Sequence, residues 1–527
     1  MRGKPALRLR RSLSLSFLAV AALVLARAGV GGVSPAVLVV DDDGQASPTN
    51  CDATVPAFTS IQAAISSAFP GDVIKICPGI YVENLVVGTS NLVITSFPGQ
   101  KANTIVNPVL PFTSPIIKVT ASNVRIVQLT LDGGGMGGGP TFCDTSSHAG
   151  IVFTGSSASG TVQGVTVRGT TRTNNNGPAA NGCFSTTSDY FQGVGIAVEK
   201  GATAVIEDSD ISDYQTEGIH VIGVGSSATI RRNTIVGPGV QNVRSADGVR
   251  VEGGATATIT ENTIRNNKFN GPSGHAAAVD LPSTSGAVTV TKNTFKDNCI
   301  GVGIRTTASV TLRLNSFEGN GPVADCPPNP FPRGGVTVQA VGIQSILCNS
   351  FQGNGKGLDN ETGSTVTAEW NWWGAANGPA PSGSGDLVEG VVDFDPWLTS
   401  QPDPFFCPPR LEGGGNCLSL DLQNRTYRFR TSTNVLFTGS LRLMRRGSVI
   451  QFSNLRMPGE TWILGGTVNL IPGRGQAVLR TFFPRQTFFI NDPNLSEQYL
   501  CTVRQRRDDS GRESAFCEGL FRLSRAP

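Results

Sequence analysis

The chain has 527 residues, of which 64 are glycine and only 7% are aromatic, and its formal net charge is +3. A balance this close to neutral gives no sign of the basic surface that nucleic acid requires, so we expect no nucleic-acid partner. The many glycines predict a chain with many tight corners.

The first 28 residues have the pattern of an export signal. Five basic side chains lie between Arg2 and Arg11, an apolar run extends from Leu13 to Leu25, and Ala26-Arg27-Ala28 forms a cleavage site. The run is too short to span a bilayer comfortably, and we find no second one. We therefore expect a mature chain that is secreted, periplasmic or at the cell surface, with twin-arginine export through Arg10-Arg11 as an alternative route.

A short helix is predicted at about residues 59–69. Thr59-Ser60 can cap its start, the apolar residues Ile61, Ala64, Ile65 and Ala68 fall on one face, and Pro70-Gly71 ends it. Residues 73–76 then alternate as a strand. An open stack of strands exposes its core and its edges, so we interpret the helix as the cap over the first strands.

Residues 82–204 contain further short strands, interrupted by two insertions. The first, 133–147, is glycine-rich, and the second, 170–192, is polar. Long loops on a rigid scaffold often build binding sites, although loops that only decorate the surface are equally compatible with this pattern.

A repeat dominates residues 205–373. Seven times a polar corner is followed by a large apolar residue, and these apolar anchors are Ile211, Ile235, Ile264, Phe295, Phe317, Phe351 and Trp373. Their separations are 24, 29, 31, 22, 34 and 22 residues. A coil of short strands has a minimum turn and lets loops grow out of it, whereas a helical repeat keeps its length.

Each repeat contains a strand, an Asn-Thr-Ile or Asn-Ser-Phe corner and a glycine-led strand such as 218–221 or 248–251. Such strands bury a face only when they stack in parallel, about 4.8 Å apart. We expect the corner asparagines to adopt left-handed backbone angles and to bond to their copies in the next coil. The predicted fold is an all-β right-handed parallel β-helix, and a fixed-blade propeller fits less well.

Three stretches carry a family resemblance: "FTSIQAAISSAFPGDVIKICPGIYVENLVV" at 58–87, "NWWGAANGP" at 371–379 and "DFDPWL" at 393–398. Together with the asparagine corners, they resemble the pectate-lyase-like β-helix superfamily, including its NosD-type and other carbohydrate-related members. The resemblance covers roughly residues 37–400. It implies the fold but no single activity, because the superfamily holds lyases, hydrolases, esterases, epimerases and proteins without a known reaction.

A second domain is predicted at 405–527, after a β-helix domain at 29–404. Its first residues have the composition of a linker, and about eight alternating segments follow, which predicts a small antiparallel sandwich or barrel. Residues 411–527 hold 16 arginines, no lysine and 9 acidic residues, whereas 29–410 hold 20 basic and 30 acidic residues. This basic domain could grip an anionic polysaccharide or the cell envelope, or dock on the acidic β-helix.

All 11 cysteines lie in the mature chain, which suits an oxidising compartment. We expect five disulfides, Cys51–Cys77, Cys143–Cys183, Cys326–Cys348, Cys407–Cys417 and Cys501–Cys517, the last across a hairpin. Cys299 is left over, as either a buried free cysteine or a catalytic thiol without an evident histidine partner.

A row of charged side chains is predicted on the outer face. If Ile219, Val249, Val279 and Ile304 point inward, then His220, Arg250, Asp280 and Arg305 stand on successive coils. Glu252 shares the face of Arg250, and Glu217 and Asp247 occupy equivalent corners. In the enzymes that the chain resembles, a lyase uses carboxylates with calcium and an arginine or lysine base, and a hydrolase uses paired carboxylates.

Plain surface ion pairs are an equally simple interpretation of this row. Trp370, Trp372 and Trp373 either form a sugar platform, with Trp370 as a substrate contact, or pack as a cap. His148 and His275 lie in loops, and we assign them no role. The Gly-His-Gly motif of polygalacturonases, the Asp-Pro-His motif of alginate epimerases and a clear Arg-Pro signature of pectate lyases are all missing.

Three functions follow from these patterns. The first is non-catalytic binding of polysaccharide or envelope glycan on an outer face. The second is a polysaccharide lyase or glycoside hydrolase acting on uronic-acid-containing glycans. The third is a NosD-like periplasmic accessory protein, although three histidines make copper binding weak. We expect a monomer, no metal site and no cofactor, with calcium only in a lyase.

Overall fold

The computed structural model describes residues 35–402 except 111–113, 135–147, 172–191, 242–244, 272–275, 322–323, 327–332 and 343, together with eight strands beyond residue 428. The chain divides into two units, 1–401 and 402–527. The predicted export signal and the tips of both predicted insertions, with Cys143 and Cys183, lie outside the described residues. Among those residues, no helix combines the length and apolar content needed to cross a bilayer.

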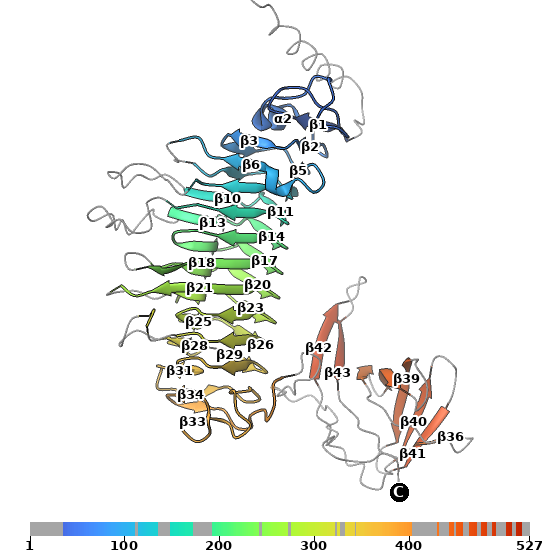
Figure 1. The fold of residues 1–527 in the computed structure, drawn as a ribbon. Coiled ribbons are helices and arrows are strands. Elements are labelled where there is room, and N and C mark those ends of the chain that lie inside the picture. Colours follow the sequence, from blue (N-terminus) through green and yellow to red (C-terminus); the bar gives the residue numbers. More distant parts are fainter. Residues whose placement is uncertain are drawn as a thin grey trace, which may run out of the picture. The chain divides into compact units, whose positions relative to one another are not determined.

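Three parallel sheets build the first unit, because each coil contributes one short strand to each sheet (Figure 1). The 11-stranded sheet contains β1 (Val37–Val40), β2 (Val73–Ile76), β5 (Val93–Ser96), β8 (Val124–Val127), β11 (Ser159–Gln163), β14 (Thr203–Glu207), β17 (Ser227–Arg231), β20 (Thr256–Thr260), β23 (Val288–Thr291), β26 (Val310–Arg313) and β29 (Gln344–Leu347).

The 12-stranded sheet contains β4 (Leu85–Val87), β7 (Ile117–Val119), β10 (His148–Thr154), β13 (Gln192–Glu199), β16 (Glu217–Ile222), β19 (Asp247–Glu252), β22 (Ala277–Leu281), β25 (Ile300–Ile304), β28 (Gly334–Val338), β31 (Leu358–Asn360), β34 (Gly385–Glu389) and β33 (Pro379–Ala380). The 10-stranded sheet contains β3 (Gly79–Val82), β6 (Thr104–Asn107), β9 (Thr130–Asp132), β12 (Thr166–Arg168), β15 (Asp210–Ser212), β18 (Thr234–Gln241), β21 (Thr263–Phe269), β24 (Thr294–Lys296), β27 (Ser316–Glu318) and β30 (Ser350–Gln352). A short parallel pair, β32 (Val366–Thr367) with β35 (Val392–Asp393), follows them. The predicted parallel β-helix is confirmed.

The core is a column of the apolar anchors that the repeat predicted. Register pairs these residues from coil to coil, and all seven are fully buried. In the last coils the rings stack, with centroid distances of 4.8 Å between Phe317 and Phe351 and 4.6 Å between Phe351 and Trp373. Trp373 therefore belongs to the core, as the cap-packing interpretation expected, and not to a sugar platform.

The corner asparagines form the first asparagine ladder: Asn233, Asn262, Asn293, Asn315, Asn349 and Asn371. From Asn262 onward, each side-chain carbonyl accepts hydrogen bonds from the backbone N–H and the amide Nδ2 of the asparagine one coil earlier. The carbonyl of Asn233 accepts the backbone N–H of Ser209 instead. The bonding between copies is confirmed, but the left-handed angle was assigned to the wrong residue. It belongs to the preceding residue in each coil, for example Lys292 at φ 58° and Leu314 at φ 58°.

A second asparagine ladder was not predicted. It joins Asn267, Asn298, Asn320 and Asn354 by the same pattern of bonds. Tyr214 closes one end with a 2.5 Å hydrogen bond to Asn267. At the other end, Asp386 accepts bonds from Gly353 and Asn354. The sequence carried a signal, because each of these asparagines follows a first-ladder asparagine by five residues.

The helix α2 (Ile61–Ser67) begins at Ser60, whose side chain accepts from the Ala63 N–H. Its buried residues Ile61, Ala64 and Ile65 join the same hydrophobic core as the coils. Glu83, from the loop after β3, accepts bonds from the N–H groups of Ile61 and Gln62 at 2.8 and 2.9 Å. A carboxylate at the start of a helix satisfies donors that have no partner within the helix.

Two disulfides lie fully within the described residues. The predicted Cys51–Cys77 bridge is confirmed. The predicted pairing of Cys326 with Cys348 is wrong, because Cys326 bonds to Cys299, which we had left over. Cys348 is itself disulfide-bonded, so it is not the partner of Cys326. The predicted bridge of Cys407 with Cys417 lies outside the described residues.

The second unit is described as antiparallel strands. One sheet has the order β36 (Phe429–Thr431), β41 (Thr487–Asn491), β40 (Gln476–Thr481), β39 (Ile463–Ile471), β38 (Val449–Arg456) and β37 (Arg442–Arg446). A separate hairpin pairs β42 (Thr502–Arg507) with β43 (Glu513–Glu518) and places Cys517 opposite Val503. Cys501 lies outside the described residues, so its bridge to Cys517 stays a prediction, as does the sandwich or barrel.

Candidate functional site on the 12-stranded sheet

The candidate site lies on the outer face of the 12-stranded sheet, on strands β16 to β25. Alternate residues of these strands point inward, and Ile219, Val249 and Val279 are fully buried in the core. The intervening side chains therefore point outward, which places His220, Arg250 and Asp280 on one row. Register pairs His220 with Arg250 and Arg250 with Asp280, as predicted.

Arg305 does not follow in this row. Asp280 pairs with Gly303, and Leu281 pairs with Ile304, so the predicted alignment of this coil was wrong by two residues. Because side chains alternate with a period of two, the slip leaves Arg305 on the same face but moves it past the end of β25. Its guanidinium reaches back, and Nη2 lies 2.6 Å from both carboxylate oxygens of Asp280.

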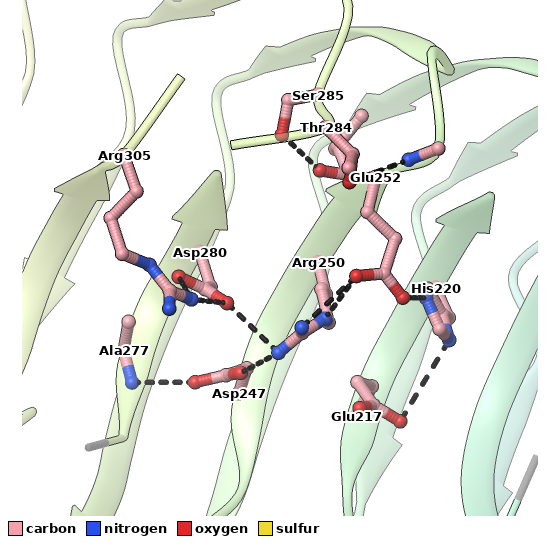
Figure 2. A network of polar contacts seen from close by, with 12 residues as sticks. Glu217, His220, Asp247, Arg250, Glu252, Ala277, Asp280, Thr284, Ser285 and Arg305 are labelled. Atoms are coloured by element: carbon pink, nitrogen blue, oxygen red, sulfur yellow. Dashed lines mark hydrogen bonds and ion pairs between the residues drawn. The ribbon is translucent and has the colours of Figure 1, made fainter. Parts of the chain in front are cut away.

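Seven side chains join into one charged network: Glu217, His220, Asp247, Arg250, Glu252, Asp280 and Arg305 (Figure 2). Arg250 lies at its centre. Its guanidinium is 3.0 Å from Glu252, 3.0 Å from Asp280 and 3.5 Å from Asp247. The structure thus brings together every predicted outer-face residue of coils β16 to β25.

His220 connects the network to the earlier coil. Its Nε2 lies 2.9 Å from Glu252, and its Nδ1 lies 3.9 Å from Glu217. Asp247 is fixed from the other side, because its Oδ1 accepts the backbone N–H of Ala277 at 2.8 Å. Figure 2 shows these contacts running across three neighbouring strands.

The network is buried to a degree that the sequence did not predict. Asp280 is 0% exposed and His220 is 2% exposed, whereas the Arg250 and Arg305 side chains keep 27% and 28% of their surface. The site therefore has a buried floor of acidic and imidazole groups and a rim of two guanidinium groups. Buried charges are tolerated only when they are paired, and here the printed ion pairs provide the pairing.

Burial and charge act against each other on the titrating groups. Burial alone would lower the pKa of His220, but the hydrogen bond to Glu252 and the charges of Glu217 and Glu252 outweigh it and raise this pKa. Burial would raise the pKa of Glu252, yet the bond from His220 and the Arg250 charge lower it to about 2. The Arg250 pKa is raised because Asp280 and Asp247 overcome its burial. For His220, Glu252 and Arg250, the pairing of charges therefore outweighs the effect of burial on the pKa.

Later coils extend the same row in a way that the sequence analysis missed. Gly303 pairs with Thr337, Thr337 with Asp359, and Asp359 with Glu389. Lys356 bridges the last two carboxylates at 2.6 Å each. Aligning the strands after Arg305 with the earlier glycine-led strands would have predicted these residues from the sequence.

Trp370 does not join the site. Its φ of 58° places it in the column of left-handed corner residues that precede the first asparagine ladder, and its carbonyl accepts the N–H of Cys348. This corner follows the 11-stranded sheet and not the 12-stranded sheet. Trp370, which we predicted as a substrate contact, therefore lies at a different corner of the coil from the charged network.

One group of metal-type donors occurs in the described part of the chain: Asp41, Cys51 and Cys77, whose donor atoms lie within 4.8 Å of one another. The two sulfurs are joined in a disulfide, so they are not available as thiolate ligands. The carboxylates of the charged network do not form such a group among the described residues, since they are directed to the two arginines and to His220.

One family model matches part of the chain. Residues 149–372 match the family model described as the right-handed beta helix region. No curated protein sequence matches this chain.

Three solved structures show a distant likeness. A complex of XylC with xylose has 10% identity and a TM-score of 0.38, and it covers 64% of this chain and 70% of that chain. The catalytic unit of a GH87 alpha-1,3-glucanase from Streptomyces thermodiastaticus has 15% identity and a TM-score of 0.42, with 72% of each chain covered. Pectate lyase Pel9A has 16% identity and a TM-score of 0.31, with 69% of this chain and 79% of that chain covered.

None of these three likenesses carries an argument about activity. The family match gives a right-handed β-helix, and the three parallel sheets agree with that architecture. The first unit of the chain is a right-handed parallel β-helix.

Proposed function

We propose that this protein binds a glycan along the outer face of the 12-stranded sheet. The observation that carries the proposal is the pair of partly exposed guanidinium groups, Arg250 and Arg305, which the buried carboxylates beneath them hold on this face. Lys356, also partly exposed, lies on a later coil of the same face, so an extended polymer lying along the helix axis would pass three cationic donors. Hydroxyl groups of sugars can both donate to carboxylates and accept from guanidinium groups.

The rim supports this interpretation. Arg250 and Arg305 keep part of their surface, and the carboxylates beneath them hold both guanidinium groups in fixed positions. A donor that is already ordered loses little conformational entropy when a ligand binds. Glycan binding also agrees with the family resemblance of the sequence, which is to carbohydrate-related proteins.

We also propose that the mature chain works outside the cytoplasm. The pattern of residues 1–28 supports export, and the Cys51–Cys77 and Cys299–Cys326 disulfides suit an oxidising compartment. The basic composition of residues 411–527 offers a second place where an acidic polysaccharide could bind. Such binding would weaken steeply with salt, unlike binding through hydroxyl groups.

The proposal is tested by retention of the full mature chain on a panel of immobilised neutral, acidic and amino polysaccharides. Arg305→Ala should weaken retention, and the matched variant Arg125→Ala, exposed on the outer face of the 11-stranded sheet, should not. Equal retention of both variants would exclude the charged network as the binding site, and the absence of any retention would exclude glycan binding.

Catalysis is a second candidate, and the convergence of four carboxylates and one imidazole favours it. His220, with its raised pKa, could donate a proton as an acid, whereas Glu252, with its pKa lowered to about 2, is a weak base and would act as a carboxylate beside the imidazole. Arg250 is a poor base for a lyase, because its raised pKa keeps it protonated. New reducing ends that disappear in His220→Gln would identify a hydrolase, and ultraviolet absorbance from new double bonds, with or without calcium, would identify a lyase.

The NosD-like accessory role stays a prediction from the sequence. Copper binding measured on the full chain tests it directly. A stoichiometric copper complex without glycan retention would favour this role over both candidates above.

A further inference from the structure

The six-stranded sheet of the second unit contains arginines and no acidic residue. Its strands, β36 to β41, hold six arginines and no lysine, aspartate or glutamate. Residues 411–527 as a whole hold 16 arginines and 9 acidic residues, so all of these acidic residues lie outside the sheet. Most of the excess positive charge of the second unit is therefore concentrated on this one sheet.

Register places four of the six arginines on one face, which we call the basic face. In antiparallel strands, directly paired residues share a face, and the faces alternate along each strand. Arg480 lies two residues from Val478, and Arg442 lies four residues from Arg446, so each pair shares a face. One row of paired residues on this face crosses all six strands: Arg430, Phe489, Val478, Asn469, Val449 and Arg446.

The opposite face of the sheet is apolar. It also holds Arg445, whereas Arg456 lies beyond the register shift between β38 and β39. An antiparallel sheet commonly packs its apolar face on a core and leaves its polar face in water. The basic face is therefore the one that suits a soluble partner. The apolar residues of the opposite face include Phe429, Leu443, Phe452, Leu470, Leu479 and Ile490.

The residue types on the basic face select the kind of partner. Guanidinium groups bind carboxylates and other oxyanions through paired hydrogen bonds. Amide and hydroxyl residues lie among the arginines, and such groups can donate to and accept from the hydroxyl groups of a sugar. An anionic lipid surface would respond to the positive charge alone. The amide and hydroxyl residues are Gln451, Thr467, Asn469, Gln476, Thr487 and Asn491.

We infer that the basic face binds an acidic polysaccharide, a polymer whose sugars carry carboxylate or sulfate groups. The polymer would lie across the strands, along the row from Arg430 to Arg446, with Arg442 and Arg480 beside it. Six strands about 4.8 Å apart give this row a length of about 24 Å, which is enough for several sugar units. The inference rests on the proposed glycan binding and deepens it, because it gives the second unit a binding face and a ligand class of its own.

Binding of the full mature chain to immobilised polygalacturonate and dextran sulfate, with neutral dextran as the comparison, tests the inference. At least one acidic polymer should bind, dextran should not, and the binding should fall steeply as salt screens the ion pairs. A variant with Arg430→Gln, Arg442→Gln, Arg446→Gln and Arg480→Gln should bind about tenfold or more weakly at low salt. The same four positions changed to lysine keep their charge and should retain salt-sensitive binding.

A charge-matched control uses four arginines outside the sheet. Arg504→Gln, Arg506→Gln, Arg507→Gln and Arg512→Gln change β42 and the residue before β43, and they remove the same charge from the same unit. This variant should keep most of the binding. An equal loss in both glutamine variants would overturn the inference, because net charge alone would then explain the binding.

Other outcomes separate this inference from the proposed function. Arg305→Ala, on the first unit, should leave the salt-sensitive binding unchanged. Loss of that binding in Arg305→Ala, with wild-type binding in the glutamine variant of the basic face, would overturn the inference and leave glycan binding on the 12-stranded sheet standing. Binding to phosphatidylglycerol vesicles without binding to either acidic polymer would assign the basic face to membranes and also overturn the inference. If no polysaccharide bound the chain at all, both proposals would fail.

Discussion

Asn293 and Asn315 are 22 residues apart in the chain, and Asn293 donates to Asn315 Oδ1 through both its backbone N and its Nδ2, each at 3.0 Å. Both residues are 1% exposed. From Asn233 to Asn371, each coil is tied to the next by such a pair of buried bonds. The ladder therefore fixes the vertical alignment of the coils on which the charged network depends.

Asn293→Ala should strongly destabilise the protein. It removes the carbonyl that accepts from Asn262 N and Nδ2, so the buried backbone N–H loses its acceptor, whereas Nδ2 keeps its bonds to the carbonyls of Ile230 and Thr260. The expected cost is about 1–3 kcal/mol for each unsatisfied group, seen as a lower midpoint of urea unfolding. The exposed Asn103 gives a matched control, and Asn103→Ala should change the free energy of unfolding by less than about 0.5 kcal/mol. Equal effects of the two substitutions would contradict the ladder's role.

The Cys299–Cys326 bridge should appear in a peptide map obtained under non-reducing conditions. A fragment joining these two residues is expected, and a fragment joining Cys326 to Cys348 would show that the assignment is wrong. Cys299→Ser should lower the free energy of unfolding by about 2–4 kcal/mol, because it releases a constraint on the unfolded chain.

Arg250→Met should destabilise the protein by about 3–5 kcal/mol, because it leaves Asp280 and Asp247 buried with less compensating charge. Adding Asp280→Asn to this variant removes one of the two buried carboxylate charges that Arg250 had paired and should recover part of the loss. Thermal unfolding of the single and double variants measures both effects. A double variant less stable than Arg250→Met would show that the pairing is not what holds these residues in place.

The ion pair between His220 and Glu252 should make the stability of the protein depend on pH. Its folded pKa is raised above the unfolded value of about 6.5, so the pair stabilises the folded state fully below pH 6.5 and loses that contribution as pH rises through the folded pKa. The difference in melting temperature between wild type and His220→Gln should therefore shrink above neutral pH. A difference that grows with pH would contradict the assignment. Glu252 acts in a separate window, since its contribution is lost only as pH falls from about 4.5 toward 2.

The fold could be predicted because its period is visible in the residues that make it. A corner residue followed two positions later by a large apolar residue recurs along the chain, as at Asn293 and Phe295. Both are buried as predicted, Asn293 in the first asparagine ladder and Phe295 in the core. The hydrogen bonds of the ladder require an asparagine at the same corner of successive coils, and this requirement leaves a clear repeat in the sequence. The second ladder left the same signal, five residues further on, and was overlooked.

The details of the site depended on register. The stretch Gly301-Val302-Gly303-Ile304 offers two glycine-led alignments, and both put the same side chains outside because they differ by two residues. Hydrophobic alternation therefore predicted the face of Arg305 correctly and its position wrongly. Only the strand register between neighbouring coils distinguishes the two alignments. This register is set when the sheet assembles, so the sequence of one strand does not give it.

The Cys299–Cys326 disulfide and the burial of the charged network could not be predicted from the sequence for a similar reason. Cys299 lies one residue before β25, and Cys326 lies in the connection to the next coil, so their proximity arises from stacking and not from sequence distance. Several pairings of 11 cysteines fit a sequence equally well. The burial of Asp280 likewise depends on what surrounds an outer face, and strand periodicity carries no information on that.

The most direct test of the central claim, glycan binding on the outer face of the 12-stranded sheet, is a comparison of Kd values for two blocked variants. Gly303→Phe places a bulky side chain on this face, and Thr289→Phe places one on the 11-stranded sheet. Calorimetry with an oligosaccharide of the polysaccharide whose retention depends on Arg305 should give a Kd raised about tenfold or more for Gly303→Phe and unchanged for Thr289→Phe. An unchanged Kd for Gly303→Phe, or a loss of binding in Thr289→Phe alone, would place the glycan elsewhere and contradict the account.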